Sequence, residues 1–192
     1  MRLFLAIELS ARIRESLAGV GSRWPVGDAQ VRWSEPESFH LTVVFLGEHD
    51  PVAVPGIQEA CAAVALETSP FRIALAGASG FPKRGPLRTL FVPLSEGESA
   101  WRELVLRAEP WFVPMGVARN GGLVPHITVG RVKSGGDDPV LRSGIETLSG
   151  ESFGVQDITG LTLVQSVLDR TGATYHTVSE HRFGNAPSTE LA

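Results

Sequence analysis

The segment HLTVVFLG (40–47) is repeated in outline by HITVGRV (126–132). Each begins with histidine, an apolar residue, threonine and a second apolar residue, and each contains a glycine, Gly47 or Gly130. Both segments are rich in β-branched residues, a composition typical of a strand. We therefore expect two strands with the same polar pattern in two similar parts of the fold.

Alternate side chains of a strand point to opposite faces of the sheet. His40 and Thr42 are therefore expected on one face, about 7 Å apart, and His126 and Thr128 should share a face in the same way. Each strand would present an imidazole and a hydroxyl on one face and apolar side chains on the other. The residues expected on the opposite, apolar faces are Leu41, Val43, Phe45, Ile127 and Val129.

Strands and helices alternate around these two segments. Further strands are expected at 3–9, 71–81, 88–94, 160–169 and 174–183, and helices at 11–20, 51–68, 98–112 and 137–149. Strands that form hairpins among helices indicate an α+β fold. We predict two pseudo-symmetric lobes, each an antiparallel sheet with helices packed outside, flanking a central cleft. Residues 1–183 would form this single bilobal domain, followed by a flexible tail at 184–192.

Composition limits the class of function. The chain has 192 residues and a net charge of −4, so no global basic field indicates binding to long nucleic acids, although a few placed cations could still bind one phosphate. The opening MRLFLAIELS has too short an apolar run for a signal peptide, and no later run has membrane-spanning length. We expect a cytoplasmic protein with no membrane partner. The single cysteine, Cys61, is expected in the core.

Two imidazoles that face each other across a cleft suit the hydrolysis of a phosphodiester. Near neutral pH, one histidine can accept a proton while the other donates one. The attacking water and the leaving alkoxide lie on opposite sides of phosphorus, so the acid and the base must also lie on opposite sides. The two threonine hydroxyls are expected to donate hydrogen bonds to the non-bridging oxygens, where negative charge builds.

Two alternatives to this chemistry remain open. The histidines could be ligands of a metal hydrolase, although the sequence has no HxH, HExxH or paired CxxC motif to complete a site. The same cleft could belong to a non-catalytic module that binds RNA ends or nucleotides. Chelator sensitivity tests the first alternative, and turnover tests the second.

Five segments, in order, resemble the two-histidine (2H) phosphoesterase superfamily, and within it the bacterial and archaeal RNA 2′,3′-cyclic phosphodiesterases, historically called 2′-5′ RNA ligases. They are MRLFLAIEL (1–9), VRWSEPESFHLTVVFLGE (31–48), GFPKRGPLRTLFVPL (80–94), VPHITVGRV (124–132) and LTLVQSVLDRTGATYHTV (161–178). The departures are Phe91, where tryptophan is common, and Gln165, where an acidic residue is usual. We expect neither residue to touch the histidines.

The resemblance implies a fold, a reaction and a set of site residues. A monomer with the 2H fold would hydrolyse RNA 2′,3′-cyclic phosphate ends to 2′-phosphomonoesters without a metal or cofactor, with 2′-5′ ligation as the reverse reaction. His40 would be the proton donor and His126 the proton acceptor, while Thr42 and Thr128 would bind the phosphate. Arg131 would also bind phosphate. Simple strand alternation instead predicts a surface salt bridge on the other face, unless the preceding glycine allows a bulge.

The weaker candidates have structural explanations as well. Tyr175, the only tyrosine, could stack on a base or close the cleft, and packing within a hairpin is the alternative. Phe45 and Trp33 could stack on a nucleobase, although core packing is expected for Phe45. The basic residues of the loop at 82–88 could contact an RNA backbone or form a solvated hairpin tip. These residues are Lys83, Arg84 and Arg88.

Overall fold

The computed structural model describes residues 1–117, 124–168 and 173–184 and contains two antiparallel sheets. The four-stranded sheet has the order β10 (Ala173–Arg182), β9 (Gly160–Leu168), β1 (Arg2–Glu8) and β3 (His40–Glu48). The six-stranded sheet has the order β2 (Gln30–Trp33), β7 (His126–Ser134), β6 (Thr89–Glu96), β4 (Phe71–Ala76) and β8 (Ser152–Ile158), and β5 (Ser79–Phe81) pairs with β6. Strands β3 and β7 contact each other, so the two strands that begin with histidine meet between the sheets.

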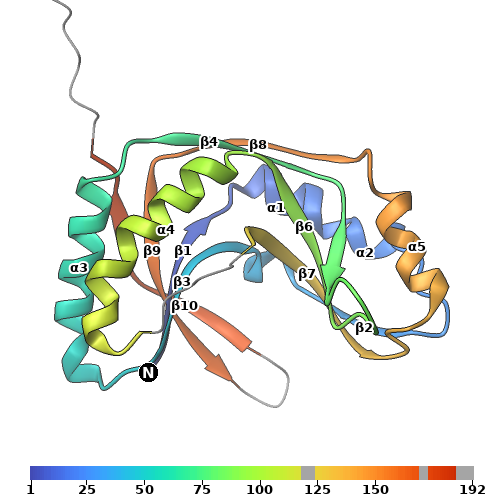
Figure 1. Ribbon diagram of the computed structural model, residues 1–192, viewed down its shortest axis with the longest axis horizontal. Helices are drawn as coiled ribbons and strands as arrows, with labels where there is room; N and C mark the ends of the chain where they lie inside the picture. Colours follow the sequence, from blue (N-terminus) through green and yellow to red (C-terminus); the bar gives the residue numbers. More distant parts are fainter. Residues whose placement is uncertain (118–123, 169–172, 185–192) are drawn as a thin grey trace, which may run out of the picture.

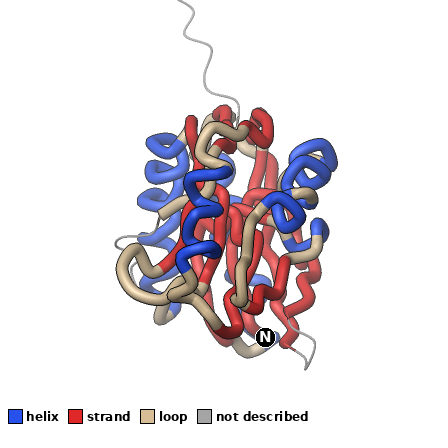
Figure 2. Tube along the Cα trace, turned by 90° about the vertical axis from the view of Figure 1, so that its right-hand side faces the viewer, coloured by secondary structure: helices blue, strands red, loops and turns tan. Residues whose placement is uncertain are grey.

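Helices cover the outer sides of both sheets (Figure 1). The four-stranded sheet contacts α3 (Val54–Leu66) and α4 (Glu98–Phe112). The six-stranded sheet contacts α1 (Ala11–Ala18) and α2 (Val20–Arg23), and α5 (Pro139–Thr147) lies at the end of the molecule beside α2. Three 3-10 turns complete the described elements: η1 (Pro36–Ser38), η2 (Pro51–Ala53) and η3 (Val113–Met115). Figure 2 shows the strands in the middle of the molecule and helices on both sides.

The predicted α+β fold with two antiparallel sheets and outer helices is confirmed. The predicted helix at 98–112 has the observed bounds, whereas the helix predicted at 11–20 is divided at Gly19 into α1 and α2. Two edge strands, β2 and β8, have no counterpart among the predicted elements. β2 has only four residues, and β8 contains Gly154, whose φ of +119° lies in a region that other residues rarely adopt. Short strands and strands with a glycine inside them carry little periodic signal.

A single large cluster of buried apolar residues runs behind both histidine strands and includes Leu41 and Ile127. Cys61 is fully buried, as expected, and burial raises the pKa of its thiol to about 12. No helix in the described part of the chain is long and apolar enough to cross a membrane. Of the predicted tail, residues 185–192 lie outside the described residues, and the amide of Gly184 donates to the carbonyl of Ala65 (3.0 Å).

Candidate active site

The two histidine strands carry the same irregularity. In the β1–β3 ladder Thr42 lies opposite Ala6 and Val44 lies opposite Leu5, so Val43 is an extra residue and forms a β-bulge. Both Val43 and Val44 are fully buried, which means that two successive side chains point into the core. The alternation of faces therefore restarts after the bulge.

In β7 the bulge occurs at the corresponding place. Thr128 lies opposite Phe91 and Gly130 lies opposite Leu90, so Val129 is the extra residue. The bulge brings the next residue, Arg131, to the face that carries His126 and Thr128. We call the face with the two histidines and the two threonines the histidine face. The alternation that predicted Arg131 on the opposite face is wrong because it assumed a regular strand.

The same bulge corrects the prediction for Phe45. This residue lies opposite Phe4 in the ladder, and its ring is 6.4 Å from the ring of Phe4, which in turn lies 4.7 Å from the imidazole of His40. Phe45 is 53% exposed, so it is not a core residue. It belongs to the histidine face, at the position in β3 that Arg131 occupies in β7.

Each imidazole is held by a carbonyl two residues before it. His40 Nδ1 lies 2.8 Å from the carbonyl oxygen of Ser38, and His126 Nδ1 lies 2.7 Å from that of Val124. A carbonyl oxygen can only accept, so we assign the proton of each neutral ring to Nδ1. Nε2 of both rings then carries the lone pair that can accept or return a proton.

Aromatic rings fix both imidazoles from the side. The His40 ring lies 4.7 Å from Phe4 and 5.0 Å from Tyr175, which meets it edge-on. The His126 ring lies 5.0 Å from Phe91 and 5.2 Å from Phe81. The expectation that Phe91 does not touch a histidine is therefore wrong, because Phe91 pairs with Thr128 across the β6–β7 ladder. Two aromatic contacts at each ring, together with the carbonyl, restrict its rotation and set the direction of Nε2.

Burial and positive charge keep both imidazoles neutral. Burial is the main cause that lowers the pKa of His40 from 6.5 to about 4, and the hydrogen bond to Ser38 opposes it. The nearby charges of His126, Arg14 and Arg131 lower it further. Burial also lowers the pKa of His126, and Arg131 adds to the effect. Arg131 therefore acts on both histidines, which places its positive charge close to the pair.

The threonines lie beside the histidines and are supported from behind. Thr42 and Thr128 are half-buried on the histidine face. The carbonyl of Thr42 accepts a hydrogen bond from Trp101 Nε1 of α4 (3.1 Å). Behind Thr128, the ring of Trp33 lies so close to Gly130 that an added Cβ would be 2.9 Å from it. A glycine is required there because Trp33 packs flat against the strand.

Residues 7–91 match the family model described as LigT-like phosphoesterase. The sequence is also 31% identical to the RNA 2′,3′-cyclic phosphodiesterase of Archaeoglobus fulgidus, over 91% of this chain and 96% of the relative. The chain belongs to the LigT-like phosphoesterase family. The RNA 2′,3′-cyclic phosphodiesterase of Methanothermobacter thermautotrophicus is 29% identical, over 91% of this chain and 95% of the relative.

Solved structures share the fold of this LigT-like phosphoesterase. The protein TT0787 of Thermus thermophilus superposes with a TM-score of 0.78 at 26% identity and covers 96% of this chain and 99% of its own. E. coli LigT in its apo form superposes with a TM-score of 0.74 at 21% identity, with 96% and 98% covered. The resemblance to the 2H superfamily is thus confirmed, and the chain is a phosphoesterase.

Of the other candidate residues in this LigT-like chain, some lie near the histidines and some lie on the other side of the sheet. Tyr175 lies on the histidine face against His40, and Lys83 Nζ lies 5.4 Å from the centre of the Phe91 ring and donates to Ser79 Oγ (2.7 Å). Trp33 lies on the other side of its sheet, 6.2 Å from Trp24, so the prediction that it stacks on a nucleobase is wrong.

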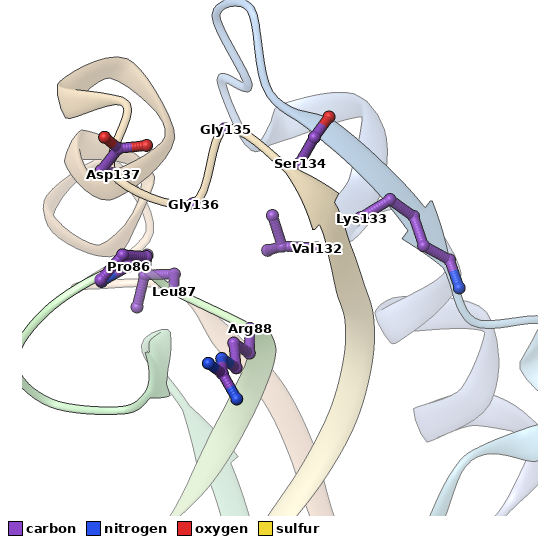
Figure 3. Close-up of a pocket in the computed structure, with 9 residues that line it drawn as sticks. All are labelled: Pro86, Leu87, Arg88, Val132, Lys133, Ser134, Gly135, Gly136 and Asp137. Atoms are coloured by element: carbon purple, nitrogen blue, oxygen red, sulfur yellow. The ribbon is translucent and has the colours of Figure 1, made fainter.

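Arg88 lines a surface cavity of about 390 Å³ between the loop at 82–88, the end of β7 and the turn that leads to α5. Figure 3 shows its side chain and that of Lys133 leaving the cavity wall in different directions. Arg84 is exposed in the same loop. Of the three predicted RNA-contacting residues, Lys83 contacts the Phe91 ring beside His126, and the contact of all three with RNA stays a prediction.

Some members of this site have no local signal in the sequence. Phe4 and Phe81 contact the imidazoles, and Arg32 lies opposite Arg131 in the β2–β7 ladder. They come from strands distant in sequence, so only pairing between strands reveals them. No group of three or more His, Cys, Asp or Glu side chains suited to hold a metal ion occurs among the described residues.

Proposed function

We propose that this phosphoesterase opens RNA 2′,3′-cyclic phosphates to 2′-phosphomonoesters through acid–base catalysis by His40 and His126, without a metal ion. The observation that carries the proposal is the equivalence of the two imidazoles. Each donates Nδ1–H to a carbonyl, keeps Nε2 available, and lies beside a threonine and near Arg131. The relatives from Archaeoglobus and Methanothermobacter bear the name of this reaction.

In the proposed reaction, Nε2 of His126 accepts a proton from water, and the water oxygen attacks phosphorus. The bond between phosphorus and the ribose 3′ oxygen breaks, and protonated His40 donates its proton to that oxygen. Thr42 and Thr128 donate hydrogen bonds to the non-bridging oxygens, and Arg131 stabilises the negative charge that builds there. The family resemblance supports His40 as the donor. If the 5′-hydroxyl of a second RNA replaces water as the nucleophile and the 3′ oxygen again leaves, the same groups would join the two RNA ends through a 2′-5′ linkage.

The role of proton donor requires a protonated His40. Because the pKa of His40 is low in the free protein, the substrate must raise it. In the free enzyme both rings are neutral at pH 7, since burial lowers both pKa values. A bound phosphate carries a negative charge, and an opposite charge within about 4–6 Å favours the protonated form of histidine. Substrate binding would therefore raise the pKa of His40 and load the proton that it later donates.

This argument predicts the pH dependence. The productive free enzyme has one proton on the histidine pair, and that form becomes more abundant below pH 7 because the pKa values are lowered. We expect kcat/KM to rise as pH falls from 8 to 6, by up to about tenfold per unit, and the optimum of kcat to lie at a higher pH than that of kcat/KM. Steady-state profiles with a cyclic-phosphate substrate test this. An optimum of kcat/KM above about pH 7.5 would contradict it.

Product analysis tests the reaction itself. A short RNA with a 2′,3′-cyclic end should yield the ring-opened 2′-phosphate, and EDTA should leave the rate unchanged. Loss of activity in EDTA with recovery on adding zinc would favour the metal-hydrolase alternative. Binding without turnover would favour the non-catalytic RNA-end module, which the pair of acid–base groups disfavours because binding alone does not need them.

We also propose that the protein acts in the cytoplasm as a monomer, with residues 1–183 folded as one bilobal domain. The large apolar cluster that runs behind both histidine strands supports a single folding unit. Gel filtration at micromolar concentration tests the monomer.

A further inference from the structure

Two arginines lie side by side next to the proposed phosphate site. Arg32 of β2 is the direct partner of Arg131 in the β2–β7 ladder. Directly opposed residues in an antiparallel pair point to the same face, so Arg32 shares the histidine face with Arg131. The next residue, Trp33, points the other way and packs on Gly130, which agrees with this orientation.

This arrangement is unfavourable in the free protein. Like charges directly opposite each other destabilise a sheet. Both side chains are exposed, and neither forms an ion pair with a carboxylate in the described part of the chain. Other arginines of the protein are paired, as Arg72 is with Asp157 and Arg102 with Glu98. Two neighbouring guanidinium groups without a carboxylate are the arrangement that a bound anion would neutralise.

Guanidinium groups recognise phosphate in particular, because their planar N–H groups match two phosphate oxygens. In the proposed function the terminal cyclic phosphate lies between the histidines, with Arg131 close to both. Arg32 lies across from Arg131 at the outer edge of the six-stranded sheet, farther from the histidine pair. The next anionic group of an RNA substrate is the phosphodiester on the 5′ side of the terminal nucleotide.

We propose that Arg32 binds this 5′ phosphodiester, so that the enzyme favours the end of an RNA chain over a cyclic mononucleotide. The inference rests on the proposed function and adds a second phosphate subsite to it. Half-buried Thr89, which lies opposite Arg131 on its other side, borders the same part of the face.

Three substrates test the subsite: adenosine 2′,3′-cyclic phosphate, the dinucleotide ApA with a 2′,3′-cyclic phosphate, and the same dinucleotide with a neutral methylphosphonate linkage. For the unmodified enzyme we expect kcat/KM at least about tenfold higher for the charged dinucleotide than for the other two, which corresponds to about 1.4 kcal/mol. Arg32→Gln should lower kcat/KM about tenfold for the charged dinucleotide and leave the mononucleotide within twofold. In this variant, kcat/KM for the charged dinucleotide should be nearly equal to that for the methylphosphonate dinucleotide.

Arg12→Gln is the matched control, because Arg12 is an exposed arginine of α1 and is not part of the proposed site. It should change none of the three rates. Arg32→Lys keeps a positive charge and should retain part of the preference. On a longer RNA, Arg32→Gln should also reduce the salt dependence of binding by about one counterion, a slope change of about 0.7 for a single strand.

The outcomes separate this inference from the proposed function. If the unmodified enzyme cleaves the mononucleotide and both dinucleotides equally well, the subsite is refuted and the reaction stands. If Arg32→Gln slows all substrates alike, Arg32 supports the strand and binds no second phosphate. If the unmodified enzyme cleaves no cyclic phosphate at all, the proposed function fails. The methylphosphonate comparison needs no variant, so it tests the subsite even if Arg32→Gln does not fold.

Discussion

His40→Ala and His126→Ala should each lower kcat for a 2′,3′-cyclic phosphate end by about 10²-fold or more, the usual cost of losing a general acid or base. In the proposed mechanism the two groups act together in one step. The double variant should therefore be little slower than either single variant, because groups that act as a unit have non-additive effects. Steady-state rates of the three variants measure both expectations.

His176→Ala provides the control for these variants. His176 is an exposed histidine of β10, and its ladder partner is Gln165. Its loss should leave kcat unchanged, and thermal unfolding should show that all variants fold. Near-normal turnover by either His40→Ala or His126→Ala would refute the acid–base assignment. Multiplicative losses in the double variant would indicate that the histidines act independently.

Arg131→Gln should lower kcat/KM by about 10²-fold, similar to removing one donor from a site that stabilises developing negative charge. It should also raise the pKa of both histidines, since the charge of Arg131 lowers both. The acidic limb of the kcat/KM profile should therefore move to higher pH. NMR titration of the two imidazoles measures this shift directly.

The pKa readout separates two roles of Arg131. A side chain that only stabilises the bulge would, when replaced, change stability and rate without raising both histidine pKa values. Arg12→Gln again serves as the control, because it removes an exposed guanidinium outside the proposed site. An unchanged rate and unchanged histidine pKa values in Arg131→Gln would remove Arg131 from the proposed mechanism.

Periodicity predicted most of the fold because most elements are regular. The helix at 98–112 presents Trp101, Leu104 and Ala108 to the core at helical spacing, and its bounds were predicted correctly. The strands at 40–47 and 126–132 were predicted to within two residues. Ser10 caps α1 through its hydroxyl, as its position before the helical pattern indicates.

The bulges explain the errors at the site. Strict alternation of side chains between two faces assumes that each residue of one strand pairs with one residue of the neighbouring strand. That assumption assigned Phe45 and Arg131 to the wrong face. The adjacent pair Val43 and Val44 contained a signal, since two successive apolar residues in an alternating strand allow both to point inward. In β7 the second of the two is Gly130, which gives no such apolar signal.

The sequence by itself determined the two histidine–threonine strands and the phosphoesterase family, because these depend on which residues follow one another along the chain. Only the tertiary structure decided which other groups share the face with them. Phe4, Phe81 and Arg32 come from other strands, and the bulges that turn Phe45 and Arg131 toward the histidines depend on register. Register is set by packing between distant segments, and no local pattern in the chain specifies it.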